Sequence, residues 1–266
     1  MYEINAVDNQ LGKPEQKTIP RPPFSLCVCA SKGGGKSSLL INLLIKNEFY
    51  HNKFNQVYWV SPTHFLDAKL DILRKTSGIK KINHPLLNEI KRKRGKSIVA
   101  DPIPEKITKT SLSDTDFVED LTTEWLEELI KSQKAIITEH GKKLSDEVLV
   151  VLDDSISSKI IRTAQFKKFL LNSRHYNIST VFSTQSYMML ERNIRLNNSF
   201  ICVFSVPSMT NLKQIWDENP AGLDWNDWYQ VYMYATKRPF GFLSINYQND
   251  LKHRLINGFS EFLCIE

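Results

Sequence analysis

The residues from Ala30 to Ser38 form a glycine-rich segment with the chemistry to bind phosphate. They read Ala-Ser-Lys-Gly-Gly-Gly-Lys-Ser-Ser and fit the pattern GxxxxGK[ST], with alanine in place of the first glycine. Glycines let successive backbone N–H groups converge on a phosphate, and a ligand-free glycine-rich turn is the alternative. In this pattern the lysine reaches the β- and γ-phosphates, and the next hydroxyl binds Mg²⁺. The expected ATP-binding residues are Ser31, Lys32, Gly33, Gly34, Gly35, Lys36, Ser37 and Ser38, with Lys36 as the catalytic lysine and Ser37 as a metal ligand.

Two adjacent acids, Asp153 and Asp154, end the apolar run that begins at Val148. Ligands of parallel sheets bind at the carboxyl ends of the strands. We therefore expect Asp153 to hold Mg²⁺ and Asp154 to position water as the general base. Glutamate is the usual base, but Glu147 lies at the far end of this strand, roughly 20 Å away at about 3.3 Å per residue. An Asp-Asp helix cap is the non-catalytic alternative.

A third apolar run, from Ser179 to Phe182, ends in the polar residues Ser183, Thr184 and Gln185. In P-loop motors with an extra strand between the phosphate-loop strand and the metal strand, this position senses the γ-phosphate. Gln185 is therefore the candidate sensor, and ordinary loop polarity is the alternative.

Strands and helices alternate around these residues, which predicts parallel pairing and an α/β fold with a doubly wound sheet. The expected strands are 24–30, 56–61, 148–153, 178–183, 199–206 and 240–247, and the expected helices are 37–47, 122–138, 158–173, 186–195, 209–216 and 225–235.

The domain organisation follows from shifts in composition. Residues 1–23 contain four prolines, which predicts an extended N-terminal arm. Residues 24–266 form a single predicted domain with a helical insertion at about 62–147. The insertion contains the basic run Lys91–Lys96, for which contact with DNA phosphates, a solvated loop and nuclear targeting are the open interpretations.

The overall composition excludes several classes of protein. The 266 residues carry 35 Lys+Arg and 29 Asp+Glu, and 41% are hydrophobic, as in an ordinary globular protein. The longest apolar stretches are far shorter than the roughly 20 residues that cross a bilayer, so we expect no membrane partner. The net charge of +6 is compatible with a polyanionic partner.

Several segments together resemble the FtsK/HerA DNA-pumping ATPases. The segments 174–185 and 193–201 are similar to the arginine, sensor strand and following segment of that superfamily. The Asp-Asp pair, the Arg174-His175 pair and the segment 239–246 resemble its genome-packaging branch in large DNA viruses and virophages, of the poxvirus type. The resemblance covers residues 24–61 and 148–247.

The resemblance implies a RecA-like (ASCE) P-loop NTPase core that assembles into a ring, either a pentamer or a hexamer, with ATP at the subunit interfaces. It also implies an arginine that reaches into a neighbour's site. Arg174 is the candidate for this role, and Arg162, Arg192 and Arg195 are its rivals.

The function implied by the resemblance is an Mg²⁺-dependent ATPase motor that translocates double-stranded DNA and packages a viral genome into a capsid. Capsid proteins are further expected partners, and the expected location is intracellular, in the host cytoplasm or virus factory, or in the virion. One alternative is a partitioning-type switch ATPase, whose signature lysine lies five residues before the invariant one, whereas Lys32 lies four before Lys36. The other is a DNA-binding protein with a vestigial P-loop.

Overall fold

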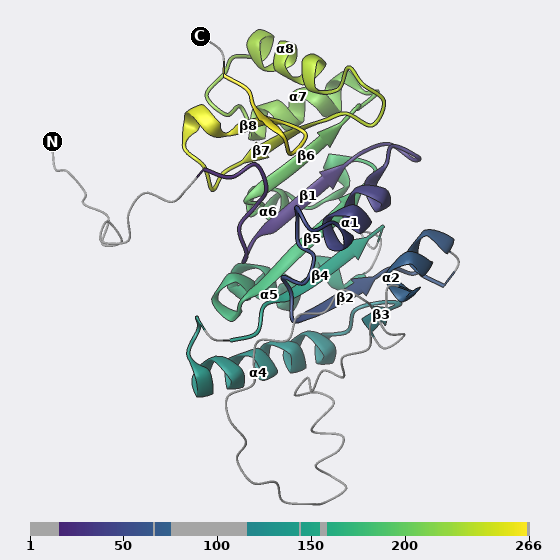
Figure 1. Ribbon diagram of the computed structural model, residues 1–266, viewed down its shortest axis with the longest axis vertical. Helices are drawn as coiled ribbons and strands as arrows, with labels where there is room; N and C mark the ends of the chain where they lie inside the picture. The colour runs from purple at the N-terminus through teal and green to yellow at the C-terminus, as the bar shows by residue number, and fades with distance from the viewer. Residues whose placement is uncertain (1–15, 66, 76–115, 144, 155–158, 265–266) are drawn as a thin grey trace, which may run out of the picture.

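The computed structural model describes residues 16–65, 67–75, 116–143, 145–154 and 159–264. One twisted sheet runs along the long axis of the molecule, and helices cover both of its faces (Figure 1). None of the helices within these described ranges is long and apolar enough to span a membrane.

Nine strands of the described residues form this sheet, in the order β3-β2-β4-β5-β1-β6-β7-β8-β9. The six strands from β3 to β6 in that order are parallel, and β7, β8 and β9 continue the sheet antiparallel. The predicted mostly parallel, doubly wound sheet is therefore confirmed. The strands are β1 (Ser25–Cys29), β2 (Gln56–Val60), β3 (Phe117–Val118), β4 (Val148–Asp153), β5 (Ile178–Thr184), β6 (Phe200–Phe204), β7 (Phe242–Asn246), β8 (Leu255–Asn257) and β9 (Glu261–Phe262).

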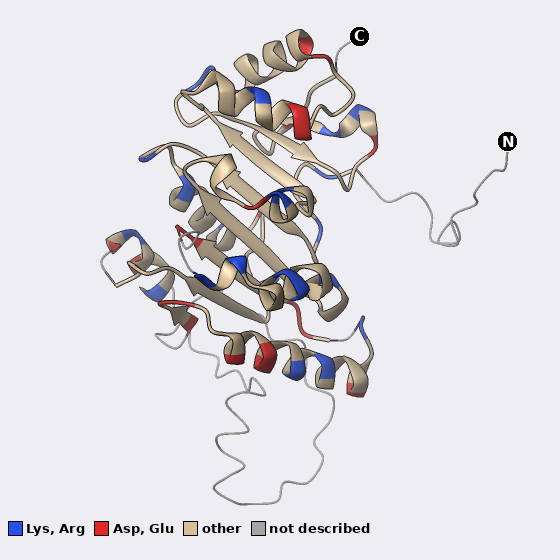
Figure 2. Cartoon of the chain, turned by 180° about the vertical axis from the view of Figure 1, so that it is seen from behind, with Lys and Arg blue, Asp and Glu red and all other residues tan. Residues whose placement is uncertain are grey.

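Helices connect successive strands of the chain from β1 to β7. They are α1 (Lys36–Ile45), α2 (Asp71–Lys75), α4 (Thr123–His140), α5 (Ala164–Ser173), α6 (Arg192–Leu196), α7 (Met209–Glu218) and α8 (Trp225–Ala235). Short 3₁₀ turns lie at η5 (Lys159–Arg162), η6 (Arg174–Tyr176) and η7 (Tyr187–Met189). The helix α4 carries acidic residues in its first half and basic residues after them, whereas the central strands carry little charge (Figure 2).

Both faces of the sheet are buried. Successive side chains of a strand point to opposite faces, so each strand contributes to two core layers. In β4, Val148, Val150 and Leu152 pack in the core layer that α4, α5, α7 and α8 cover. Leu149 and Val151 face the other layer, which α1 covers. Asp153 continues this alternation, so its side chain belongs to the face that carries α1.

Some predicted elements differ from the structure. The segment 62–147 is not only helical, because it contributes strand β3 to the sheet edge, and α4 packs into the main core. The basic run Lys91–Lys96 lies outside the described residues. The helix predicted at 186–195 is split into η7 and α6, because the backbone at Leu190 is extended (ψ 136°). The helix predicted from 158 is split at Thr163, whose side chain accepts a hydrogen bond from Phe166 N and so caps the start of α5.

The described part of the predicted arm, residues 16–23, packs against the turn after β7. The backbone N–H of Lys17 donates to Asn249 Oδ1 (3.2 Å), and Asn249 Nδ2 donates back to Lys17 O (2.8 Å). Arg21 N and O are bonded in the same reciprocal way by the Gln248 side chain, at 2.6 and 2.8 Å. The side-chain amides of Asn249 and Gln248 therefore bind the backbone of this segment, as the backbone of a paired strand would.

Candidate nucleotide-binding site

The glycine-rich segment forms the turn between β1 and α1, as the sequence predicts. Gly33 and Gly35 have positive φ angles of 74° and 99°, which glycine adopts far more readily than other residues. Gly34 N donates to Ser31 O (3.0 Å), and a Cβ atom at Gly34 would lie 3.0 Å from both Ala30 Cβ and Ser31 O. Three consecutive glycines are therefore needed for this loop, hereafter the phosphate loop (residues 30–38).

The two lysines of the phosphate loop differ in their environment. Lys36 is only 7% exposed, and its Nζ donates to Ala30 O (3.0 Å) and Ser31 O (3.3 Å). The Lys36 ammonium group thus binds two carbonyl oxygens of the loop. A bound phosphate would take their place as its hydrogen-bond acceptor. Lys32 is exposed at the turn. The Lys36 side chain is therefore held at the candidate phosphate site, whereas the Lys32 side chain extends into solvent.

Asp153 reaches the phosphate loop from the end of β4. Its Oδ2 accepts a hydrogen bond from Ser37 Oγ (3.2 Å), although the two residues are 116 positions apart. Burial raises the pKa of the Asp153 carboxyl, and the neighbouring Asp154 raises it further. The nearby Ser183 and Ser37 hydroxyls and the Lys36 ammonium group lower this pKa in part. A buried carboxylate beside a hydroxyl is an oxygen donor set that suits Mg²⁺.

Strand β5 brings the candidate sensor to the same edge because it lies between β1 and β4. Ser183 is paired with Asp153 on one side and with Val28 on the other. Thr184 O accepts a hydrogen bond from Ala30 N (3.1 Å) at the start of the phosphate loop. This order is the one predicted for P-loop motors with an extra strand. Ser183 was not among the predicted site residues, although its place at a strand end is the signal that could have identified it.

Asp154 and Gln185 lie just beyond the ends of β4 and β5. Asp154 has a positive φ of 49° and is exposed, because the chain turns out of the sheet at this residue. Gln185 is exposed as well, since Thr184 Oγ1 closes the turn by accepting from Ser186 N (3.1 Å). Neither side chain hydrogen-bonds to another residue in the described part of the chain. Both are therefore available to a ligand at this edge.

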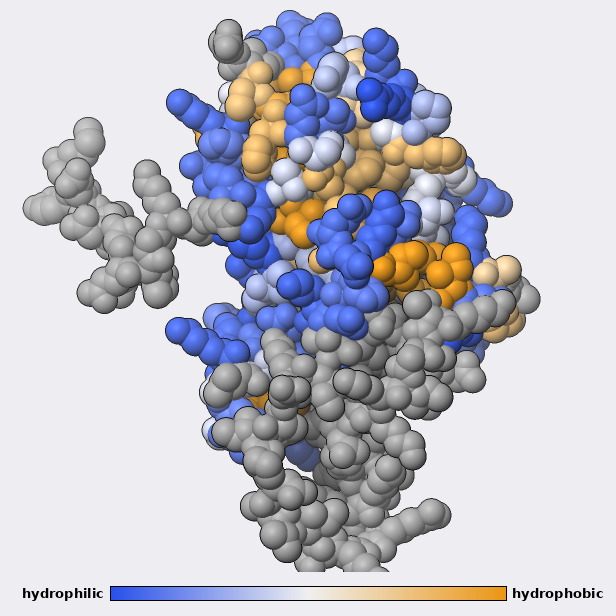
Figure 3. All heavy atoms as spheres, viewed as in Figure 1, coloured by the Kyte–Doolittle hydropathy of each residue, from blue (hydrophilic) through white to orange (hydrophobic). Residues whose placement is uncertain are grey.

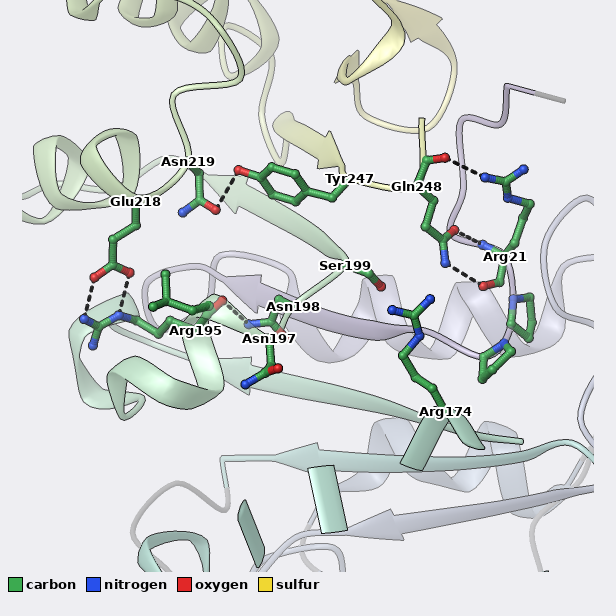
Figure 4. Close-up of a pocket in the computed structure, with 13 residues that line it drawn as sticks. Arg21, Arg174, Arg195, Asn197, Asn198, Ser199, Glu218, Asn219, Tyr247 and Gln248 are labelled. Atoms are coloured by element: carbon green, nitrogen blue, oxygen red, sulfur yellow. Dashed lines mark hydrogen bonds and ion pairs between the residues drawn. The ribbon is translucent and has the colours of Figure 1, made fainter. Parts of the chain in front are cut away.

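Arg174 lies near the amino-terminal ends of the parallel strands, opposite the phosphate loop, in η6 before the first residue of β5. The seven residues of β5 separate it from Gln185 by more than about 20 Å. Arg174 extends into a recess of about 840 Å³ that Arg21, Ser199 and Gln248 also line (Figure 4). Within the described ranges its guanidinium group makes no hydrogen bond or ion pair.

The three rival arginines differ in their environment. Arg195 is buried and forms a two-pronged ion pair with Glu218, at 2.7 and 2.8 Å (Figure 4). This pairing ties Arg195 to its own subunit, so it is not available to a neighbour. Arg162 and Arg192 are exposed.

Comparison with known proteins adds an independent relationship. Residues 104–220 match the family described as poxvirus A32 protein. This chain is similar to the poxvirus A32 proteins. The A32 match covers less than half of the chain and confirms the predicted resemblance to poxvirus-type packaging ATPases. It includes Asp153, Arg174 and Gln185 but not the phosphate loop, which therefore stands as a separate observation. No protein of curated function matches the chain in sequence.

Solved structures that resemble the chain include two of the genome packaging NTPase B204 from Sulfolobus turreted icosahedral virus 2. The complex with sulfate is 14% identical, covers 85% of this chain and 93% of its own, and has a TM-score of 0.52. The complex with ATP-gammaS is 15% identical, covers 86% and 94%, and has a TM-score of 0.51. At these identities the likeness concerns the fold alone, and it confirms the predicted RecA-like α/β fold.

Proposed function

We propose that the chain is an Mg²⁺-dependent ATPase motor that moves double-stranded DNA and packages a viral genome into a capsid. The observation that carries the proposal is the contact of Ser37 on the phosphate loop with Asp153 at the end of β4. This contact joins the two halves of a nucleotide site from segments 116 residues apart. The A32 match supports the choice of a packaging ATPase, and the B204 complex with ATP-gammaS supports ATP as the ligand.

The phosphate loop would hold the β- and γ-phosphates of ATP through its backbone N–H groups. Lys36 would exchange its bonds to Ala30 O and Ser31 O for bonds to these phosphates. Ser37 and Asp153 would hold Mg²⁺, which when bound neutralises charge on the phosphate oxygens. The donor set fits this ion because all of its atoms are oxygens and one is a buried carboxylate.

Asp154 would orient the attacking water and accept its proton, and Gln185 would contact the γ-phosphate. Arg174 lies too far from its own phosphate loop to act there, so it would serve the site of a neighbouring subunit. Such a contact joins the Arg174 end of one copy to the phosphate-loop end of the next and is therefore head-to-tail. Head-to-tail contacts form a closed ring when the rotation between successive subunits closes. A pentamer or hexamer with ATP at its subunit interfaces is the assembly that we propose.

Double-stranded DNA is the proposed substrate of the motor, with capsid proteins as further partners. The net charge of +6 favours association with a polyanion. The proposed place of action is the host cytoplasm or virus factory, with the protein retained in the virion as the other possibility.

The test is ATP hydrolysis by the purified protein with and without long double-stranded DNA, at low and moderate salt. DNA should stimulate turnover in the wild type, and salt should weaken this stimulation because DNA binding releases counterions. Lys36→Ala should lower turnover by at least about 100-fold, because it removes a donor aimed at the transferred phosphate.

Lys32→Ala is the matched control, since it removes an exposed lysine from the same loop. It should keep wild-type turnover. Turnover that ignores DNA and depends on Lys32 would favour the switch ATPase instead. Salt-dependent DNA binding without any ATP turnover would favour a DNA-binding protein with a vestigial P-loop.

A further inference from the structure

Phe240 combines high exposure with an unusual backbone conformation. Its side chain is 68% exposed, the largest value among the large apolar side chains of the described residues. Its φ angle is +60°, in the left-handed region that bulky residues rarely adopt. Residues held in this region cluster at ligand sites, where the surrounding structure fixes them.

The backbone around Phe240 is held by the turn at residues 238–241 and by the strand that follows it. Gly241 N donates a hydrogen bond to Arg238 O (2.9 Å). Gly241 also packs closely against the end of α8, because a Cβ atom at this position would lie only 2.5 Å from Ala235 O. Immediately after Gly241, strand β7 begins and pairs with β6. The ring is therefore presented from a rigid turn.

The Phe240 ring lies beside the phosphate loop. Its Cδ1 atom is 3.2 Å from the position that a Cβ atom on Gly35 would occupy, and Phe204 Cε1 is 3.6 Å from the same position. Gly35 precedes the first residue of α1, so the ring flanks the start of the helix on which phosphate would bind.

The strand order places Phe240 and the metal-binding candidate on opposite sides of the loop. Asp153 ends β4, which is separated from β1 by β5. Phe240 precedes β7, which is separated from β1 by β6 on the other side. A nucleotide that lies across the loop with its γ-phosphate toward Asp153 thus directs its nucleoside toward Phe240.

The surface in this half of the molecule is suited to a base. Apolar side chains gather on the surface over the elements β6 to β8 and α8 (Figure 3). A nucleobase has an apolar face that stacks on aromatic rings.

We propose that Phe240 is the platform on which the base of the bound nucleoside triphosphate stacks. The proposal rests on the proposed nucleotide site and adds the residue that binds the base. In the free protein the ring is left exposed to receive this ligand, and the contact with Gly35 aligns it with the phosphate loop.

The test separates the base from the phosphates by calorimetric titration of the full chain with Mg²⁺-ATP and with Mg²⁺-tripolyphosphate. Phe240→Ala should raise the Kd for ATP by about tenfold, as for loss of one stacking contact, and change the Kd for tripolyphosphate by less than about twofold. Phe240→Trp should keep ATP binding within about twofold of the wild type. Tyr234→Ala is the matched control because it removes another exposed aromatic ring, from α8, and it should alter neither Kd.

Equal weakening of both ligands by Phe240→Ala would overturn the proposal, because the ring would then act only through the phosphate loop. Unchanged ATP binding in Phe240→Ala would also overturn it, while ATP binding lost in Lys36→Ala would leave the proposed function standing. A wild type that binds neither ligand would overturn both.

Discussion

Alanine substitution should impair ATP turnover at Arg174 but stability at Arg195, although both residues line the same recess. Arg195 is buried with Glu218, at exposed side-chain fractions of 7% and 6%. Its Nη1 also donates to Leu190 O (2.6 Å), which supports the break between η7 and α6. Arg174 is exposed and makes no contact of this kind with the described residues.

The expected magnitudes follow from burial. Breaking a buried ion pair by removing one partner costs about 3–5 kcal/mol, because the other charge is left buried. At roughly 2–4 °C per kcal/mol for a chain of this size, Arg195→Ala should lower the unfolding temperature by about 6–20 °C. Arg174→Ala should change the free energy of unfolding by no more than about 0.5 kcal/mol. As a trans arginine, however, its loss should reduce ATP turnover by about 10³-fold.

The assay pairs thermal and urea unfolding, each followed by tryptophan fluorescence, with DNA-stimulated ATP hydrolysis at a temperature where all variants are folded. Arg162→Ala is the control, since Arg162 is an exposed arginine of η5, and it should change neither quantity. Wild-type turnover in Arg174→Ala would refute its role at a neighbour's site. A wild-type unfolding midpoint in Arg195→Ala would refute the importance of the buried pair.

Two further predictions concern charge. Hydrogen bonds from Arg195 hold the pKa of Glu218 below its ordinary 4.5, so this pair stabilises the fold above that pH and its contribution is lost as the pH falls through the lowered value. Glu218→Gln should therefore be less stable than the wild type at pH 7 and lose less of its free energy of unfolding on acidification; parallel acid titrations would contradict this. The raised pKa of Asp153 means that its charge opposes folding at neutral pH, so Asp153→Asn should raise the unfolding temperature of the metal-free protein. Mg²⁺-ATP at about 100 times its Kd should stabilise the wild type by about 2.7 kcal/mol and the variant by less; equal stabilisation would argue against Asp153 as a metal ligand.

The sequence by itself was sufficient for the elements that local interactions determine. The phosphate loop follows from glycines between an apolar run and a helical pattern, and the structure places residues 30–35 between β1 and α1 and residues 36–38 in the first turn of α1. Asp153 could be assigned to the end of a strand because the apolar run before it is continuous. The alternation of strands and helices was enough to predict a parallel sheet, since parallel pairing requires such connections.

Only the tertiary structure decided which of these elements meet. The insertion of β5 between β1 and β4 brings Ser183 to Asp153, and strand order depends on pairing between distant segments rather than on local spacing. The four arginines have the same chemistry in the sequence, but the pairing of Arg195 with Glu218, 23 residues away, sets it apart from Arg174. The position of Phe240 beside Gly35 could not be predicted either. It depends on β6 and β7 packing next to β1, and residues 205 positions apart carry no common local pattern that would reveal such a contact.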